Sequence, residues 1–340
     1  MSNQNHAAWI TEAKAKLQVK EAPFPKADAD QVVIRSHAIG INPVDWLVQK
    51  NDDFPGLAYP AILGCDVAGE VYEVGEGVRH VKKGDRVMAC ALGLVSNPAQ
   101  GAFQHYIILP SLAVAKIPAS MSFTEAAVLP LNVSTAALLL FKKEALGLPL
   151  PPAPGSAFET NKSVLIWGGS TSVGACAIQL AVAAGVKVVT VASPHNLSKL
   201  KDLGAAAAFD YKSPSVIDDI LTALEGTEFA GVCDAISGDA PKSWGPVYTK
   251  LGGRFGSALA PQDMPEGIQG TMVGALLIMA PQEKEVGEAI WGQWIESALA
   301  KGVVKARPPP LVVGKGLEKL QEAMEVQKKG VSYQKVVVEV

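Results

Sequence analysis

The chain has 340 residues, of which 49% are hydrophobic and 19% are charged, and its formal net charge is −3. This length and composition are typical of a soluble globular protein with two domains, each large enough to bury a core. The near-neutral charge argues against nucleic acid as a partner, and no block of Lys or Arg favours an anionic membrane surface.

Residues 1–16 lack the apolar centre of a signal peptide, so we expect a cytoplasmic protein. The most apolar segment, residues 126–141, is too short for a membrane-spanning helix and is interrupted by Pro130 and Asn132. We therefore expect no membrane association. The cysteines are scattered without a C-x-x-C pair, which predicts buried free thiols at Cys65, Cys90, Cys176 and Cys233.

Residues 30–120 read as short strands separated by turn residues, and they predict a β-rich domain. The strand-like runs lie at 31–41, 66–75 and 85–92. A helix is expected after residue 130, with Ser134 or Thr135 as its N-cap. The proline-rich segment 147–161 then predicts an exposed loop without regular structure.

From Val164 onward, strand-like and helix-like segments alternate, which indicates βαβ units and a parallel sheet. The expected strands are 164–168, 187–193, 207–211, 231–237 and 253–260. Two more helices and a final strand, residues 333–340, complete the chain. We expect that strand to return to the first domain, so that residues 1–130 and 284–340 form one discontinuous domain and residues 131–283 form the other.

The segment SVLIWGGSTSVGACAIQLA (163–181) contains a degenerate G-x-G-x-x-G turn between a strand and a helix. Gly169 and Gly174 hold the outer positions, and Thr171 replaces the middle glycine. A phosphate at a helix N-terminus needs close backbone approach and free N–H groups, and we expect the loop's hydroxyls to add donors. The loop predicts a dinucleotide site made by Gly168, Gly169, Ser170, Thr171, Ser172, Val173 and Gly174. The alternative is a Ser/Gly-rich turn in another doubly wound protein, such as a methyltransferase.

The end of the second strand of this unit indicates which dinucleotide binds. An NAD site places Asp or Glu there to bind the ribose 2′-hydroxyl. This chain has no carboxylate at that strand end, and hydroxyl, amide and ammonium groups favour a 2′-phosphate instead. We therefore expect NADPH (NADP), with its phosphate bound by Ser193, His195, Asn196, Lys199 and Tyr211. The alternative is that Lys199 is only a solvated helix residue.

These features together resemble the medium-chain dehydrogenase/reductase superfamily over almost the whole chain. The motifs that carry the resemblance are INPVDW (41–46), YPAILGCDVAGEVYEVGEGV (59–78), KKGDRVMA (82–89), GAFQHYIILP (101–110) and the 163–181 segment. INPVDW, SPHNLSKLKDLGA (193–205) and the proline-rich insertion are most similar to fungal enoyl reductases that act in trans with polyketide synthases. The zinc-free quinone oxidoreductase-like branch is a looser match. The resemblance implies an α/β fold, with a Rossmann doubly wound parallel sheet and a discontinuous β-rich GroES-like catalytic domain.

The same superfamily contains zinc alcohol dehydrogenases, whose catalytic zinc is held by a Cys and a Gly-His-Glu element. The matching positions here are 42–45 and Gly64-Cys65-Asp66, where Cys65 replaces the ligand His. No Cys lies near Asn42. A catalytic zinc needs about three protein ligands, so we expect no metal.

The resemblance implies that NADPH reduces an activated C=C, as in a polyketide-type α,β-unsaturated thioester, in secondary metabolism. The substrate is then a small or carrier-bound enoyl compound, and a polyketide synthase is the implied partner. Asn42 and Asp45 are implied at the mouth of the site near the nicotinamide, and Thr135 at the start of its helix. Further cofactor contacts are implied after the fourth and fifth strands, at Ile236, Ser237, Ser257, Ala258 and Leu259, and residues 270–277 are expected to line the pocket.

Several alternatives remain open from the sequence. Asp45 is also a candidate cap for a helix starting at Trp46, and Asn42 is also a candidate turn residue. Residues 270–277 are also a candidate core segment or oligomer edge. The protein is expected to be a monomer or a homodimer. The competing functions are an NADPH quinone oxidoreductase, a cofactor-binding protein without turnover, and a zinc alcohol dehydrogenase.

Overall fold

The computed structural model describes the chain except residues 1–3, 52–53, 55, 95–96, 261–266 and 269. The chain divides into two compact units, Met1–Leu131 with Pro309–Val340, and Asn132–Pro308. Residues 284–308 therefore belong to the second unit and not, as the sequence predicted, to the first. Trp291 and Trp294 explain the difference, because their indole N–H groups donate to Ser134 Oγ and to the Pro152 carbonyl of the second unit.

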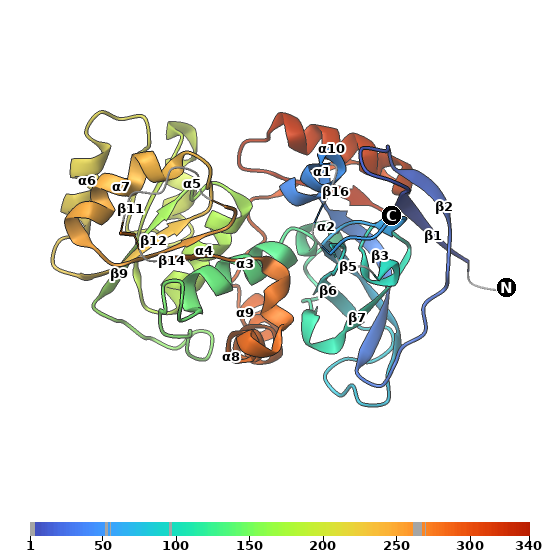
Figure 1. Cartoon of the computed structure of the whole chain (residues 1–340). Coiled ribbons are helices and arrows are strands. Elements are labelled where there is room, and N and C mark those ends of the chain that lie inside the picture. Colours follow the sequence, from blue (N-terminus) through green and yellow to red (C-terminus); the bar gives the residue numbers. More distant parts are fainter. Residues whose placement is uncertain (1–3, 52–53, 55, 95–96, 261–266, 269) are drawn as a thin grey trace. The chain divides into compact units, whose positions relative to one another are not determined.

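The second unit is built on a six-stranded parallel sheet with the strand order β11-β10-β9-β12-β13-β14 (Figure 1). Counted from β9, this is the 3-2-1-4-5-6 order of doubly wound folds. The strands are β9 (Lys162–Trp167), β10 (Lys187–Ala192), β11 (Ala207–Asp210), β12 (Glu228–Asp234), β13 (Arg254–Ser257) and β14 (Gly270–Met272). β9 lies at the point where the winding reverses, and doubly wound folds bind ligands at the carboxyl ends of the strands around that point.

Helices cover both faces of this sheet, because alternate residues of each strand point to opposite sides. Leu165 and Val189 pack with the helices α6 and α7 on one face. On the other face, Thr190 lies close to Ile178 of α4 and Leu200 of α5. The helices of the second unit are α3 (Pro130–Phe141), which begins in the first unit, α4 (Ser172–Ala183), α5 (Leu197–Lys201), α6 (Val216–Leu224), α7 (Ala240–Leu251), α8 (Lys284–Gly287), a π-helical segment (Glu288–Trp294) and α9 (Ile295–Ala300).

The first unit is β-rich. A seven-stranded sheet runs in the order β15-β16-β3-β5-β6-β8, with β7 also paired to β3, and a three-stranded sheet runs β2-β1-β4. The strands are β1 (Asn5–Ile10), β2 (Gln18–Ala22), β3 (Gln31–Gly40), β4 (Ala61–Ile62), β5 (Asp66–Val74), β6 (Arg86–Cys90), β7 (Tyr106–Pro110), β8 (Val114–Lys116), β15 (Pro310–Lys315) and β16 (Lys335–Glu339). The helices are α1 (Pro43–Lys50), α2 (Phe123–Ala126) and α10 (Leu320–Lys329).

The last strand returns to the first unit as the sequence predicted. β16 pairs in parallel with β15 and antiparallel with β3, which places it inside the larger sheet. Strands buried on both faces read as continuous apolar runs, and in β16 the residues Val336, Val337 and Val338 are all buried. Lys335 begins this strand and is also buried, an exception that becomes important below.

One helical stretch, Phe123–Phe141, is long and apolar enough to cross a membrane. Of its most apolar window, 78% is buried inside the protein, which is the behaviour of a core helix. The four cysteines are free and buried, as predicted. The proline-rich loop has no regular structure, but Lys301 Nζ donates to the Pro154 carbonyl and Pro154 is buried, so the loop is held against the unit at this point.

Candidate functional site

The carboxyl edge of the parallel sheet collects most of the residues that the sequence predicted to bind a cofactor. The glycine loop follows β9, the segment starting at Ser193 follows β10, and Tyr211 follows β11. Ile236 and Ser237 come after β12, and Ala258 and Leu259 come after Ser257, the last residue of β13. Parallel strands end at the same edge of a sheet, so these segments are neighbours.

The glycine loop has no room for side chains at its outer positions. A Cβ atom on Gly169 would lie 2.2 Å from Thr190 Oγ1, and one on Gly174 would lie 2.2 Å from the Gly168 carbonyl oxygen. Gly168 itself adopts φ +87°, a conformation that disfavours other residues. The turn thus requires glycine where the sequence has it.

Thr171 caps the helix that follows the loop. Its Oγ1 accepts the backbone N–H of Gly174 at 2.9 Å and donates to the Gly168 carbonyl at 2.9 Å. In this structure the one proton of this hydroxyl is used within the loop, so its contact with a phosphate stays a prediction. Its backbone is extended (φ −73°, ψ 163°), so a middle glycine is not required here. Helix α4 begins at Ser172. The first turn of a helix has backbone N–H groups without partners inside the helix, and here these groups can bind a ligand.

The segment after β10 carries the predicted 2′-phosphate residues. Ala192 pairs with Asp210 in the sheet, so Ser193 and Tyr211 leave adjacent strands at the same level. Lys199 Nζ donates to the buried Asn196 Oδ1 at 2.8 Å, which orients the ammonium group beside this strand end. His195 and Tyr211 are exposed.

Asp234 organises the turn after β12, and the sequence-based expectations did not include it. Its buried carboxylate accepts the backbone N–H groups of Ile236 and Ser237 at 2.9 and 2.8 Å through Oδ1, and Trp244 Nε1 at 2.9 Å through Oδ2. These contacts hold Ser237 at φ +63°, a conformation that non-glycine residues rarely adopt. The available sequence signal was an Asp directly after the apolar run Gly231–Cys233 of this strand.

Ser237 also ties the ends of β12 and β13 together. Its Oγ lies 2.7 Å from Ser257 Oγ and accepts the Leu259 backbone N–H at 2.9 Å, and Ser257 Oγ donates to the Leu259 carbonyl. Predicted contact residues from two strands thus form one hydrogen-bonded network.

Large apolar side chains are exposed at the last residue of β14 and on the segments that follow β12, β13 and β14. They are Ile236, Leu259, Met272 and Leu277, all at least 41% exposed. Small-molecule sites are mostly apolar with a few fixed polar groups, and this edge combines both. Leu277 and Met272 lie in the predicted pocket segment 270–277, whereas its Val273 and Ala275 are buried.

Thr135 does not start its helix. α3 begins at Pro130, so Ser134 and Thr135 lie in its second turn and neither is an N-cap, contrary to the prediction. Both side chains are buried, and Ser134 Oγ accepts the Trp291 indole N–H. The pattern was misleading because proline is tolerated in the first turn of a helix.

The first unit contains a buried polar centre made by Asn42, Asp66 and Lys335. Asn42 Nδ2 donates to Asp66 Oδ2 at 2.8 Å, and Lys335 Nζ donates to Asn42 Oδ1 and lies 2.8 Å from the same Asp66 oxygen. Asp66 Oδ1 accepts the Leu131 backbone N–H at 2.6 Å, in the first turn of α3. The predictions placed Asn42 at the mouth of a site, but it is buried inside this centre.

Asp45 lies beside the centre and is fully buried. α1 begins at Pro43 with Asn42 as its N-cap, so Asp45 lies in the first turn and does not cap a helix starting at Trp46. Its Oδ2 accepts the Asn42 backbone N–H at 2.8 Å, and Oδ1 has no hydrogen-bond partner among the described residues. Burial raises the pKa of Asp45 to about 7, although the Asn42 N–H and the Lys335 ammonium favour its charged form.

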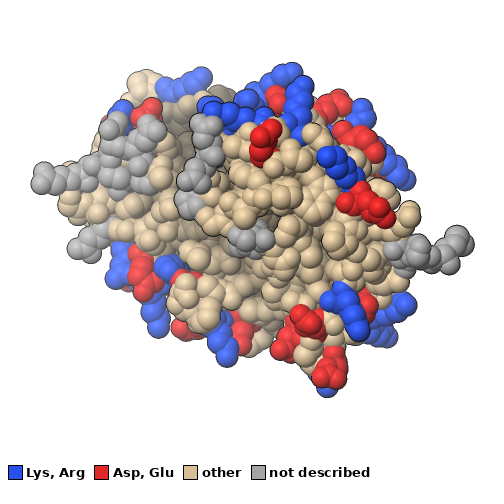
Figure 2. Space-filling model, turned by 45° about the vertical axis from the view of Figure 1, so that its right-hand side comes forward, with Lys and Arg blue, Asp and Glu red and all other residues tan. Residues whose placement is uncertain are grey.

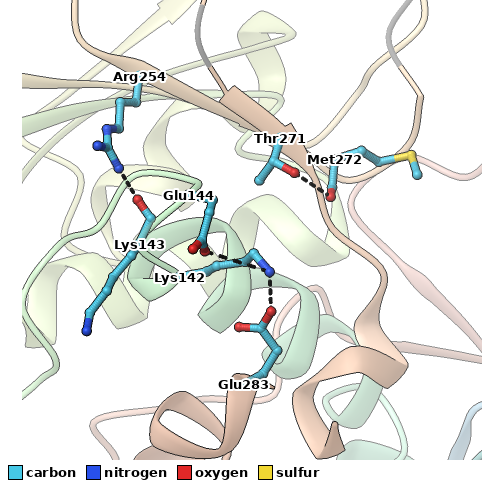
Figure 3. A network of polar contacts seen from close by, with 7 residues as sticks. All are labelled: Lys142, Lys143, Glu144, Arg254, Thr271, Met272 and Glu283. Atoms are coloured by element: carbon cyan, nitrogen blue, oxygen red, sulfur yellow. Dashed lines mark hydrogen bonds and ion pairs between the residues drawn. The ribbon is translucent and has the colours of Figure 1, made fainter. Parts of the chain in front are cut away.

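A second polar group lies elsewhere in the second unit (Figure 3). Lys142 Nζ pairs with the buried Glu283 and lies 3.8 Å from Glu144, and Arg254 donates to the Lys143 carbonyl. A shallow hollow here is lined by Lys143, Glu144, Arg254 and Gly270. Arg254 and Gly270 begin β13 and β14, so the hollow lies at the amino ends of the strands, opposite to the edge where doubly wound folds bind ligands.

Charges of both signs are mixed among the described residues on the face in Figure 2, around a broad area of uncharged residues. No single-sign patch dominates that face.

The chain is similar to known dehydrogenases along its length. Residues 28–119 match the family model described as "Alcohol dehydrogenase GroES-like domain", and residues 172–256 match "Zinc-binding dehydrogenase". The "Dehydrogenase orf1" of Aspergillus niger is 42% identical over 98% of both chains. The "Trans-enoyl reductase himH" of Aspergillus japonicus is 39% identical over 99% of this chain and 97% of its own.

Among solved structures, an alcohol dehydrogenase superfamily protein from Novosphingobium aromaticivorans superposes with a TM-score of 0.76, at 25% identity over 99% of both chains. Together with the strand order described above, this confirms the predicted fold class of a Rossmann sheet and a β-rich GroES-like domain.

Proposed function

This chain belongs to the medium-chain dehydrogenase/reductase superfamily, and on that premise we propose that it is an NADPH-dependent enoyl reductase. Its substrate is a small or carrier-bound α,β-unsaturated thioester of the polyketide type. The observation that carries the proposal is the similarity to a trans-enoyl reductase over nearly the full length of both chains. The polyketide synthase that would supply such a thioester is the proposed partner.

The chain's residues fit a nicotinamide dinucleotide at the carboxyl edge of the sheet. The glycine loop would hold the pyrophosphate at the N-terminus of α4, since Gly169 and Gly174 let the turn pack closely against Thr190 and the Gly168 carbonyl. Ser193, Lys199 and Tyr211 would hold the 2′-phosphate. The network of Ser237, Ser257 and Leu259 would shape the part of the crevice after β12 and β13.

When bound, NADPH supplies a hydride for the β-carbon of the enoyl group. The chain's contribution is to orient the reactants and exclude water. The exposed apolar side chains Ile236, Leu259 and Met272 would pack against an acyl chain. Asn42 and Asp45 are buried in the first unit, so we propose that they hold the start of α1, and that Thr135 likewise supports the core of its helix.

Zinc chemistry does not fit these residues, whatever the name of the matching family model. Among the described residues, no group of three or more His, Cys, Asp or Glu side chains is arranged to hold a metal ion. Both Asp66 oxygens are already hydrogen-bonded.

The test measures NADPH oxidation by the purified protein with a crotonyl or 2-hexenoyl thioester. Two comparison assays measure NADPH oxidation with a quinone and NADP reduction with an allylic alcohol. We expect turnover of the thioester. Brisk quinone reduction without thioester turnover would reassign the protein as a quinone oxidoreductase. Binding of NADPH, seen by fluorescence, without turnover of either substrate would show a cofactor-binding protein instead.

A further inference from the structure

The carboxylate of Asp234 is held from two sides at the end of β12. It is fully buried, and a buried charge is tolerated only where its hydrogen bonds are made. Oδ1 accepts both N–H groups of the turn that follows, and Oδ2 accepts the Trp244 indole N–H. Trp244 is itself buried and stacks on Phe255, with 5.9 Å between the ring centroids. The core therefore fixes the carboxylate, and the carboxylate fixes the turn.

The first residue that this turn orients is Ile236. A Cβ on Gly168 would lie 2.5 Å from Ile236 Cγ1 and 2.6 Å from Ile236 Cδ1, so the Ile236 side chain rests directly on the glycine loop. The same side chain is 48% exposed. Because β9 and β12 are neighbours at the point where the winding reverses, Ile236 lies where doubly wound folds bind a dinucleotide.

The second residue is Ser237, whose hydroxyl belongs to a closed ring of hydrogen bonds. The Leu259 N–H donates to Ser237 Oγ, and Ser257 Oγ donates to the Leu259 carbonyl. Since the Ser257 proton is used there, the 2.7 Å contact between the two hydroxyls is a bond from Ser237 to Ser257. The ring thus fixes both backbone groups of Leu259, whose side chain is 44% exposed.

The turn needs a support, because Ser237 has a φ of +63°. A non-glycine residue in that region is strained and stays there only when its surroundings hold it. Asp234 supplies such a contact through the Ser237 N–H. Without that contact the turn is free to relax, and Ile236 and Leu259 then lose their positions together.

We propose that Asp234 is a positioning residue for the nicotinamide half of the cofactor. It touches neither cofactor nor substrate, and it acts by holding Ile236 and Leu259 as two apolar contacts for that half. A doubly wound fold binds one mononucleotide half on each side of the reversal, so the adenosine half belongs to the segments after β10 and β11. The inference rests on the proposed cofactor but not on the proposed enoyl substrate.

The experiment compares the binding of NADPH with that of adenosine 2′,5′-bisphosphate, which lacks the nicotinamide half. Asp234→Asn keeps the shape of the side chain, but an amide cannot accept from the turn and from Trp244 at once, because one of its two ends is a donor. We expect NADPH to bind roughly 10-fold more weakly, about the loss of one hydrogen bond to a charged group. The bisphosphate should bind as it does to the wild type. Titration calorimetry measures both ligands.

Trp244→Phe is the matched control for lost stability. It removes the indole donor but leaves Oδ1 on the turn, so the Tm should fall while the affinity for NADPH stays at the wild-type value. In the double variant, Asp234→Asn with Trp244→Phe, the amide oxygen is free to face the turn. The affinity for NADPH should then recover although the Tm falls further, which a merely structural role of Asp234 cannot produce.

Ile236→Ala keeps the test decisive if Asp234→Asn does not fold, because the Ile236 side chain is half-exposed. It should also weaken NADPH binding selectively. Leu251→Ala, at an exposed apolar side chain in the last residue of α7, should change the binding of neither ligand.

Equal losses of both ligands in Asp234→Asn, or NADPH affinities that follow the Tm in every variant, would overturn the proposal. A wild type that does not bind NADPH would overturn the proposed cofactor and this inference with it. NADPH binding without turnover of the thioester would overturn the proposed reaction alone.

Discussion

Thr171 Oγ1 accepts the backbone N–H of Gly174 at 2.9 Å, so a side chain closes the loop at the place where a glycine was expected. The same hydroxyl donates to the Gly168 carbonyl, so Thr171 supports the turn in this structure. Substitutions at Thr171 should therefore change the stability of the loop more than the affinity for the cofactor, and the two quantities are measured independently.

Thr171→Ala should lower the free energy of unfolding by about 1–2 kcal/mol, the usual loss for an N-cap hydroxyl. Thr171→Ser keeps both hydrogen bonds and should stay close to wild type. Urea denaturation without cofactor measures both. A Thr171→Ala protein with wild-type stability but much weaker NADPH binding would show that the hydroxyl does turn toward the phosphate.

Lys199→Ala should weaken NADPH binding by roughly 10- to 100-fold, because a hydrogen bond to a charged group is worth about 1.5–3 kcal/mol. NADH binding should change little. Lys201→Ala is the control, since Lys201 is an exposed lysine in the same helix, α5. Fluorescence titration with both cofactors provides the comparison, and equal losses for NADPH and NADH would remove Lys199 from the phosphate site.

The buried Asp45 makes stability depend on pH. Its pKa rises from 3.8 to about 7 on folding, so the folded protein holds a proton that the unfolded chain releases at lower pH. The wild type should therefore lose stability as pH rises from about 4 to about 7 and change no further through this group above that. Relative to Asp45→Asn, which does not titrate, the loss between about pH 5 and about pH 8 should be roughly 2–3 kcal/mol. Denaturation at both pH values tests this, and parallel pH profiles for the two proteins would refute it.

Lys142→Met should destabilise the protein by about 2–4 kcal/mol, because it leaves the 5% exposed Glu283 without its partner in the network of Figure 3. Lys143→Met is the matched control. The Lys143 side chain is 82% exposed, so its ion pair with Glu285 should contribute no more than about 1 kcal/mol. Equal unfolding free energies for the two variants would contradict the assignment of Lys142–Glu283 as a buried pair.

Prolonged treatment with a strong chelator should leave both the Tm and NADPH oxidation unchanged, since the described residues form no metal-binding group. Elemental analysis of the untreated protein should find no stoichiometric zinc. A stoichiometric, chelator-sensitive metal would refute the metal-free function.

Local patterns explain what the sequence could determine. Strand and helix periodicity and turn residues depend on neighbours along the chain, so the parallel sheet and the glycine loop were predictable from residues 163–260. The start of α3 was not predictable, because proline is tolerated in the first turn of a helix. The place of residues 284–308 was not predictable either, because it depends on the partners that Trp291 and Trp294 find in the second unit.

The sequence by itself therefore determined the fold class and the segments that gather at the carboxyl edge of the sheet. Only the tertiary structure decided the buried centre, because Lys335 and Asn42 are 293 residues apart and meet through the pairing of β16 with β3. A lysine at the start of an apolar strand looks like a solvated charge until that pairing places it against Asp66. Because Lys335 and Asp66 are both buried, this lysine is the cation of an internal ion pair and not a solvated surface charge.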